Sequence, residues 1–308
     1  MEYLKIVFSY MVLVILVLVS VAFVTLMEQK ILAGSQIRVG PNFVGVWGIL
    51  QPFSDAVKLF VKEGLVLVSA NFLVYWVSPV ISLCLALFLW VIYPFLEGGM
   101  SLSYGLLLFI CVSSLSVFPI LGSGWASNCK YSMLGSLRSV AQMVSYEISL
   151  AMIILSIVWL SGSFNLSNIV FSQVYIFNFF LFFPLSLIWF ASSLAETNRS
   201  PYDFSEGESE LVSGFNTEYS AGGFVFIFMS EYSNILFMGL LFVIFFGGSA
   251  VSWIFILKMM IIVYMFVWVR ATMPRYRYDK LMYLAWKGFL PISLMLFIFY
   301  LSVLTLCL

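Results

Sequence analysis

Residues 4–27 read LKIVFSYMVLVILVLVSVAFVTLM, an apolar run with a single charged residue near its start. A hydrocarbon core about 30 Å thick requires roughly 20 such residues in an α-helix. Helices suit runs of this length, because backbone amides in lipid must be hydrogen-bonded within their own segment. Similar runs follow at residues 70–94, 103–122, 139–161, 171–195, 221–246, 251–270 and 284–306. The sequence therefore predicts an all-α integral membrane protein, with about eight transmembrane helices in one multi-pass domain spanning residues 1–308.

Composition supports lipid as the solvent and excludes several functions. Hydrophobic residues make up 63% of the chain and charged residues 9%, which is too little polar surface for a soluble globule. The formal charge is zero, so the attraction to phosphate that nucleic-acid binding requires is missing. The sequence has no histidine and no paired cysteines, which argues against a metal, haem or iron–sulfur site within this chain alone. Any electron transfer that it serves must use a redox centre on a partner.

Basic residues gather in alternate loops. The connections after the first, third, fifth and seventh predicted helices contain Lys30, Arg38, Lys58, Lys62, Lys130, Arg199, Arg275, Arg277 and Lys280. By the positive-inside rule these loops face the negative compartment, and both termini lie on the other side. The first span begins within a few residues of Met1 without an Arg-rich leader, so we expect no removable targeting peptide.

The first of these loops contains a predicted amphipathic helix, at about residues 45–62. Polar residues such as Gln51, Asp55 and Lys58 alternate at helical spacing with apolar ones such as Phe53 and Val57. This pattern predicts a helix lying in the membrane plane. It is either an interfacial anchor or a wall over an opening at the membrane surface.

Acidic residues concentrate in the loop at about residues 196–220 and continue into the sixth predicted helix. They are Glu196, Asp203, Glu206, Glu208, Glu210, Glu218 and Glu231, and Arg199 is the only basic residue among them. Crowding and desolvation both disfavour charged carboxylates, so some pKa values are expected to rise toward neutrality. The alternative is a solvated acidic loop. Glu231 lies inside a predicted span, where an ionisable group marks a functional site.

Glu147 is a second acid inside a predicted span. Arg138 precedes it by about 13 Å along a helix at ~1.5 Å per residue, which is too far for a direct pair. Glu147 therefore needs a partner on another helix or a water-filled cavity, and Glu196 and Glu231 are candidates. The alternative is a permanently neutral carboxyl that hydrogen-bonds to a neighbour such as Ser145 or Tyr146. Glu28, at the end of the first span, is either part of such a group or a simple interfacial charge.

The acidic stretch also carries a family resemblance. Residues 194–216, LAETNRSPYDFSEGESELVSGFN, resemble the signature loop of the first membrane chain of respiratory complex I. Further matching stretches are QIRVGPN at 36–42, QPF at 51–53, GWASN at 124–128, LRSVAQ at 137–142, SYE at 145–147, PRYRYD at 274–279 and WK at 286–287. The length and the richness in Phe, Met, Ser and Tyr resemble an animal mitochondrial version.

The resemblance implies a core membrane subunit of NADH:ubiquinone oxidoreductase that is inactive alone. Such a subunit forms the access tunnel for ubiquinone and couples quinone reduction to proton pumping through buried carboxylates. NADH, FMN and the iron–sulfur clusters would be bound by other subunits. The implied partners are the hydrophilic-arm subunits of the quinone site, neighbouring membrane-arm subunits and lipid. The implied location is the mitochondrial inner membrane, with the basic loops facing the matrix.

Site residues follow from the resemblance by position. The implied proton relay consists of Glu28, Glu147, Glu196, Asp203, Glu206, Glu208, Glu210, Glu218 and Glu231. The implied quinone path is lined by Arg38, Trp47, Asp55, Arg199, Phe224, Phe228 and Arg275. One position departs from the family, because Gln29 follows Glu28 where an arginine is usual. Lys30 is the available substitute, although an ammonium does not reproduce the guanidinium fork.

Two other functions remain as alternatives. One is the membrane anchor of a related hydrogenase-type complex, whose anchor chains resemble this family too. The other is a stand-alone ion transporter, which would explain buried acids but gives no reason for a dense acidic loop on one side. The proteins that remain bound after gentle detergent extraction distinguish all three.

Overall fold

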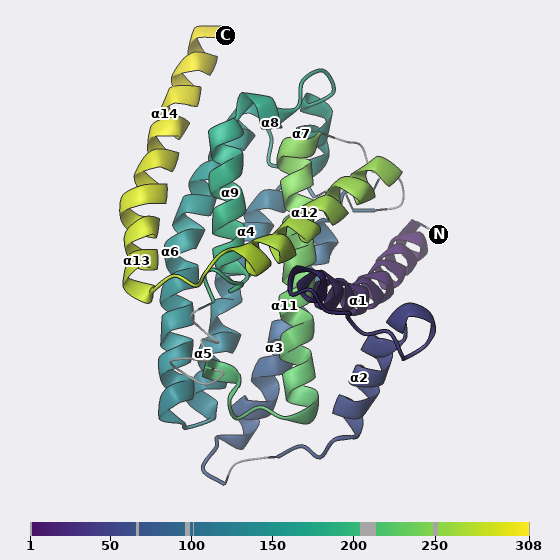
Figure 1. Ribbon diagram of the computed structural model, residues 1–308. Helices are drawn as coiled ribbons and strands as arrows, with labels where there is room; N and C mark the ends of the chain where they lie inside the picture. Colours follow the sequence, from purple (N-terminus) through teal and green to yellow (C-terminus); the bar gives the residue numbers. More distant parts are fainter. Residues whose placement is uncertain are drawn as a thin grey trace.

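The computed structural model describes residues 2–65, 68–95, 99–100, 102–203, 214–248 and 252–307, and within these ranges it contains helices and no strand (Figure 1). Seven helices of the described chain are long and apolar enough to cross a membrane. They span Tyr3–Ser35, Phe72–Ile92, Gly105–Ala126, Lys130–Ser161, Ala221–Gly247, Trp253–Thr272 and Tyr278–Val303. The predicted all-α membrane fold is confirmed.

The helices follow one another in this order. The first half contains α1 (Glu2–Ser35), α2 (Gln51–Val61), α3 (Phe72–Leu89), α4 (Gly105–Leu115), α5 (Val117–Ala126) and α6 (Lys130–Ser161). The second half contains α7 (Leu166–Ser172), α8 (Asn178–Leu181), α9 (Phe183–Glu196), α11 (Ala221–Phe242), α12 (Trp253–Thr272), α13 (Tyr278–Tyr283) and α14 (Leu290–Cys307). Short 3-10 turns lie at Val46–Gly48, Trp90–Ile92 and Gly214–Asn216, and π-helical turns at η4 (Val243–Gly247) and η5 (Leu284–Phe289).

The fifth predicted span, residues 171–195, is wrong as a continuous helix. It is divided among the end of α7, α8 and α9, none of which is long enough to cross a membrane alone. Gln173 and Asn178, within the predicted run, turn their side-chain amides to the carbonyls of Ile244 and Phe245 in η4. These tertiary hydrogen bonds satisfy backbone carbonyls in the π-helical turn η4, and the chain around Gln173 and Asn178 does not continue as one helix.

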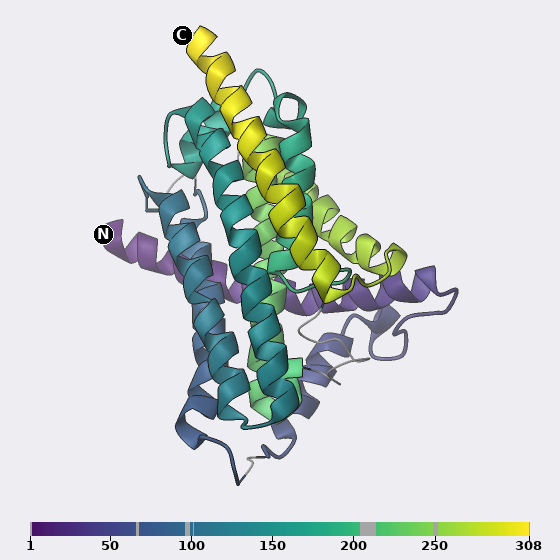
Figure 2. The ribbon, with the colours of Figure 1, turned by 90° about the vertical axis from the view of Figure 1, so that its left-hand side faces the viewer.

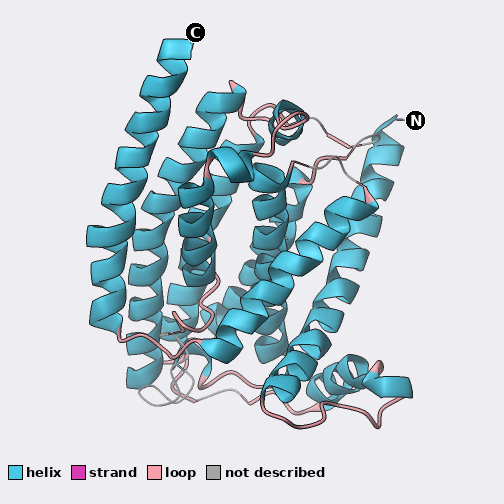
Figure 3. Ribbon diagram, turned by 45° about the horizontal axis from the view of Figure 1, so that its top comes forward, coloured by secondary structure: helices cyan, strands magenta, loops and turns pink. Residues whose placement is uncertain are grey.

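The helices form a bundle that α1 crosses obliquely. Figure 2 shows α1 running across the upright helices, and Figure 3 shows the described chain as helices joined by loops. The crossing brings α1 against α2, α11 and α12. The two helices that carry the span glutamates, α6 and α11, pack respectively against α5 and α9 and against α3 and α12. Residues that are far apart in sequence therefore meet at the centre.

Small residues permit the close packing around α6. Its buried face includes Gly135, Ser136 and Ser139. A Cβ on Gly135 would lie 2.9 Å from the Cα of Gly214, so the backbone at the end of the acidic loop lies directly on α6. Small residues allow such approach between helices in lipid, where apolar burial gives little driving force.

The amphipathic helix of the first loop is confirmed as α2, which packs against α1 and α11. Pro52 at its start is buried, while the side chains of Phe53, Val57 and Phe60 are 43%, 61% and 57% exposed. An exposed apolar face of this kind suits a helix whose outer side meets lipid or a partner.

Candidate functional site

Glu28 lies at the centre of a buried charge cluster. Its side chain is 7% exposed and forms a salt bridge with Arg270 of α12 through a hydrogen bond to Oε1. The hydroxyl of Tyr232 on α11 donates to Oε2 over 2.6 Å. The carboxylate thus accepts from one charged and one neutral donor, although it lies inside a helix of the membrane bundle. The oblique path of α1 creates this site, because it places Glu28 between α11 and α12.

Arg199 connects this cluster to a second carboxylate. One guanidinium nitrogen, NH1, lies 3.8 Å from Oε1 of Glu28, and the other, NH2, lies 3.8 Å from Oε2 of Glu231. The guanidinium carbon lies 4.3 Å from the centre of the Tyr232 ring, where the face of the ring attracts a cation. The Arg199 side chain is 11% exposed. Two carboxylates and two arginines thus form one network across α1, α11, α12 and the turn after α9.

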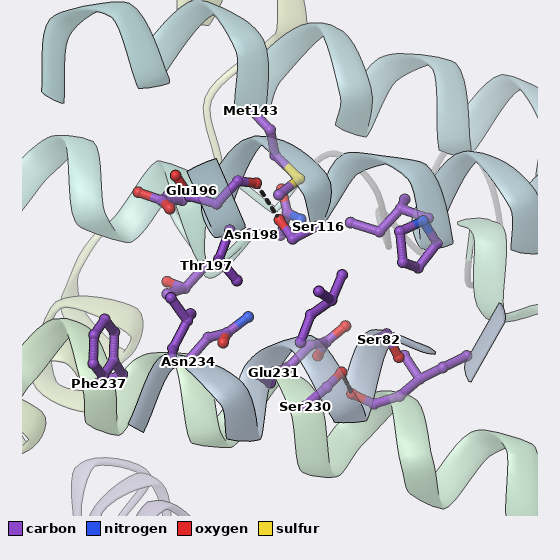
Figure 4. Close-up of a pocket in the computed structure, with 18 of the residues that line it drawn as sticks. Ser82, Ser116, Met143, Glu196, Thr197, Asn198, Ser230, Glu231, Asn234 and Phe237 are labelled. Atoms are coloured by element: carbon purple, nitrogen blue, oxygen red, sulfur yellow. Dashed lines mark hydrogen bonds between the residues drawn. The ribbon is translucent and has the colours of Figure 1, made fainter. Parts of the chain in front are cut away.

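A cavity of about 850 Å³, its open mouth included, lies on the other side of Glu231. Helices α3, α4, α5, α6, α9 and α11 all contribute to its wall. Figure 4 shows Glu196, Thr197 and Asn198 on one wall and Ser230, Glu231 and Asn234 on the opposite wall. Ser78, Ser82, Ser113, Ser116 and Ser123 add hydroxyl groups to the lining. This is a polar chamber enclosed by apolar helices.

Three oxygen atoms of this lining are buried without a hydrogen-bond partner among the described residues. They are Oε2 of Glu196 and Oδ1 of Asn198 and of Asn234. An unsatisfied buried acceptor costs about 1–3 kcal/mol, so the arrangement suits donors such as water molecules in the chamber. Burial, followed by the nearby charge of Glu147, raises the pKa of Glu196 at the end of α9 to about 8. Glu196 is therefore suited to exchanging protons with such water near neutral pH.

Glu147 is not part of the chamber lining, although it lies next to two residues that are. It is half-buried on α6, next to the hydroxyl of Ser113 and close enough to Glu196 for their charges to interact. Of its two predicted partners, Glu196 is therefore the one that this evidence supports. The contact with Ser113 also suits the alternative of a neutral, hydrogen-bonded carboxyl.

Asp203 belongs to a separate contact between two loops. Its Oδ2 accepts a hydrogen bond from Arg275 over 3.1 Å, and the amide of Tyr276 donates to the carbonyl of Pro201 over 3.1 Å. The rings of Tyr202 and Tyr276 stack with centroids 5.6 Å apart. The loop between α12 and α13 therefore fixes the first part of the acidic loop. Arg275, predicted for the quinone path, thus contacts Asp203, a predicted relay residue.

Gln142 of α6 holds this segment from the other side. It is fully buried, and its Nε2 donates to the carbonyls of Ala195 and Tyr202 over 2.8 and 2.9 Å. One side chain thus ties the helix that carries Glu147 to the residues on either side of Glu196 and Arg199.

The remaining residues predicted for the quinone path do not converge on one described pocket. Arg38 donates to Gln36, and Asp55 accepts from Gln51, so both are paired locally. Trp47 is 73% exposed in the loop before α2. Phe224 and Phe228 contact each other on α11, with ring centroids 4.2 Å apart.

Lys30 does not take the place of the arginine that is absent at Gln29. Its ammonium donates to the carbonyl of Trp47 over 2.6 Å. Arg270 and Arg199 supply the guanidinium groups beside Glu28.

Glu218 lies at the other end of the acidic loop. Its backbone carbonyl accepts a hydrogen bond from Tyr75 over 2.7 Å, and the Tyr75 ring stacks on Tyr219 at 4.4 Å. These contacts fix the entry into α11. Glu206, Glu208 and Glu210 lie outside the described residues. Within those residues, no group of three His, Cys, Asp or Glu side chains could hold a metal ion.

Sequence reasoning missed four residues of the site: Arg270, Tyr232, Asn198 and Asn234. A signal existed for Arg270, which is a guanidinium at the end of an apolar span. Asn234 is likewise a polar residue inside a span, one turn from Glu231. Tyr232 and Asn198 gave no signal of their own beyond adjacency to Glu231 and Arg199.

The chain is similar to known proteins over nearly its whole length. A model of the family described as NADH dehydrogenase matches residues 8–301. NADH-ubiquinone oxidoreductase chain 1 of Aedes aegypti is 54% identical over 304 residues, which cover 98% of this chain and 97% of the mosquito protein. The chain 1 proteins of Anopheles gambiae and Locusta migratoria are 56% and 54% identical and cover 92% and 96% of this chain, and 90% and 95% of their own lengths.

The fold and the site define a polytopic membrane protein that contains a buried carboxylate–arginine network. The matches assign it more closely: the chain belongs to the NADH dehydrogenase family, whose matching members are named chain 1 of NADH-ubiquinone oxidoreductase. The resemblance identified in residues 194–216 is confirmed.

Proposed function

We propose that this chain is a core membrane subunit of NADH:ubiquinone oxidoreductase, respiratory complex I, in the mitochondrial inner membrane. It provides part of the path of ubiquinone and couples quinone reduction to proton translocation through buried carboxylates. The basic loops face the matrix. The chain acts as a single multi-pass domain and is inactive without its partners.

The observation that carries the proton role is the chain of acidic groups through the bundle. Glu28 is linked by Arg199 to Glu231, and Glu231 shares a polar chamber with Glu196. Glu147 extends the series to α6 through its interaction with Glu196. Carboxylates inside a membrane protein, separated by oxygen atoms that can accept hydrogen bonds from water, are typical of proton relays. Asp203, Glu206, Glu208, Glu210 and Glu218 would continue the series in the acidic loop.

The quinone role rests on the surroundings of Glu28. Helices α1, α2 and α11 pack together beside it, and their aromatic groups include Phe53 against Phe23 at 6.1 Å and the Phe224–Phe228 pair. An apolar wall that ends at arginines suits a ligand with a hydrocarbon tail and a polar quinone head. Arg38, Trp47 and Asp55, in the loop and helix next to this wall, would line its opening.

Electrons must arrive from outside this chain. NADH, FMN and iron–sulfur clusters would be held by hydrophilic-arm subunits at the quinone site, while neighbouring membrane-arm subunits would receive the proton signal. The exposed apolar faces of α1, α2 and α14 suit lipid and such partners.

A pair of substitutions at Glu147 tests the proton role. Glu147→Gln keeps the shape and the hydrogen bonding but removes the titrating proton, so complex content should stay normal while inhibitor-sensitive NADH:quinone turnover and proton uptake fall. Glu147→Leu should also impair assembly, because it places an apolar side chain next to the Ser113 hydroxyl and removes the carboxyl that this hydroxyl contacts. Ile148→Leu, at the exposed neighbouring position, is the matched control. Wild-type proton uptake in Glu147→Gln would refute the relay.

The same membranes separate this proposal from the other functions. Gentle detergent extraction should recover the chain with subunits that oxidise NADH. Recovery with hydrogenase subunits would support the anchor, and recovery alone with ion current would support a transporter.

A further inference from the structure

The charge network contains an arginine shared between two carboxylates that border different cavities. Glu28, Arg199, Tyr232 and Arg270 line a small, partly open cavity of about 280 Å³, its open mouth included. Glu231, on the adjacent position of α11, lines the larger chamber that contains Glu196. The Arg199 guanidinium lines the smaller cavity and lies 3.8 Å from one carboxylate of each cavity.

Neither of these two acids is within hydrogen-bonding distance of the Arg199 guanidinium. Its two terminal nitrogens are both 3.8 Å from their carboxylate oxygens, which is beyond the length of a hydrogen bond. The face of the Tyr232 ring holds the guanidinium in this intermediate position. A planar fork with two nitrogens can contact both acids at once, whereas a lysine ammonium is a single point charge.

Sharing of this kind links the two protonation equilibria. When Glu231 takes up a proton, Arg199 loses one anionic partner and interacts more strongly with Glu28, which keeps Glu28 ionised. When Glu28 takes up a proton, Arg199 keeps Glu231 ionised by the same argument. An opposite charge within about 4–6 Å favours the ionised form of a carboxyl, so a change in that contact changes how readily the acid takes up a proton. The two acids therefore titrate as a coupled pair.

We propose that Arg199 makes protonation of Glu28 and of Glu231 mutually exclusive, so that the pair passes one proton between the two cavities. Glu28 releases a proton to cavity water as Glu231 takes one up from the water of the chamber. The Arg199 guanidinium moves the opposite way, from Glu231 toward Glu28, and the total charge is unchanged. This role rests on the proposed relay and adds Arg199 to it.

Other ionisable groups face the pair from each element that packs around it. Arg270 of α12 and Tyr232 of α11 contact Glu28, and Glu196 at the end of α9 shares the chamber with Glu231. The neighbouring helix α2 carries Asp55, paired with Gln51, and Lys58, and α3 carries Tyr75, which donates to the Glu218 carbonyl. All of these are retained in the experiment, so they contribute equally to each measurement compared.

Infrared difference titration of the assembled complex tests the linkage. The carboxylic acid band of Glu28 is identified as the band that disappears in Glu28→Gln. In the native background, Glu231→Gln should move the titration midpoint of this band by about one pH unit or more, as expected for coupled sites. In Arg199→Lys, which keeps the charge, Glu231→Gln should move it much less. Arg277→Lys, in an exposed pair with Asp279, is the matched control and should preserve the native shift.

Three outcomes would overturn the role of Arg199. One is a Glu28 band that Glu231→Gln leaves unmoved in the native background, and a second is an equal shift in the Arg199→Lys background. If Arg199→Lys prevents assembly, the double variant Arg199→Gln/Glu231→Gln is compared with Glu231→Gln alone. The third outcome is the same Glu28 titration midpoint in these two variants. Proton uptake by Glu28→Gln and Glu231→Gln, measured on the same membranes, tests the relay itself, so failure of the relay is distinguishable from failure of the linkage.

Discussion

Replacement of Gln142 by leucine should loosen the contact between α6 and the segment that contains Glu196 and Arg199, without changing an acidic residue. The Gln142 amide is the donor to the Tyr202 carbonyl at 2.9 Å and one of the donors to the Ala195 carbonyl at 2.8 Å. Loss of the donor to a buried carbonyl costs about 1–3 kcal/mol, and loss of one bond from a carbonyl that keeps another donor costs about 0.5–1.5 kcal/mol. Ala195 keeps the amide of Asn198 as a donor.

The total is about 1.5–4.5 kcal/mol, which reduces the population of the docked segment by roughly 10- to 2000-fold relative to undocked states. Because this segment contains Glu196 and Arg199, NADH:quinone turnover per assembled complex should fall. The assay is inhibitor-sensitive turnover divided by complex content on native gels. Leu150→Met, a volume-conserving change at another buried position of α6, should cost less than about 1.5 kcal/mol. Turnover of Gln142→Leu equal to that of Leu150→Met would refute the reasoning.

Three further predictions follow from particular contacts. Gly135→Ala places a Cβ 2.9 Å from the Gly214 Cα, and the overpacking should cost about 1–3 kcal/mol and reduce complex content on native gels. Gly34→Ala, with open space around its Cβ, should leave complex content unchanged. Equal complex content in the two variants would contradict this prediction. A photoreactive quinone analogue should label α1, α2 or the region of Phe228 in the intact complex, as read by peptide mapping, and labelling confined to the opposite face would count against the path. Because burial raises the pKa of Glu196 to about 8, its infrared carboxylic acid band should be present at neutral pH and disappear as the pH rises through about 8. The band should be missing from Glu196→Gln. A Glu196 carboxyl that is ionised at neutral pH would contradict the raised pKa.

The membrane fold was largely predictable because lipid imposes a strict length rule on apolar helices. Seven of the predicted runs correspond to helices that meet this rule, and the helix α2 was evident from its spacing of polar residues. The run at 171–195 failed because hydropathy counts Gln173 and Asn178 as minor interruptions. Their amides form bonds to η4 that no local pattern reveals.

The site was predictable as a set of acids but not as a network. An acidic residue inside or beside an apolar run is unusual, so Glu147, Glu196 and Glu231 were evident from the sequence. Their cationic partners depend on how distant helices cross. Arg270 and Glu28 are 242 positions apart, and Tyr232 and Glu28 are 204 apart. The missing arginine at position 29 was evident, but only the crossing of α1 and α12 shows which guanidinium group lies beside Glu28.

Proton translocation by the complex in proteoliposomes, measured together with quinone reduction for Glu196→Gln, tests the central claim most directly. This carboxyl borders the chamber and has an oxygen without a hydrogen-bond partner among the described residues. Removal of its titrating proton should slow coupled turnover on the order of 10²-fold or more at normal complex content, as loss of a proton-transfer group does. Wild-type turnover with the wild-type number of protons translocated per NADH would show that this carboxyl carries no proton, and would contradict the account.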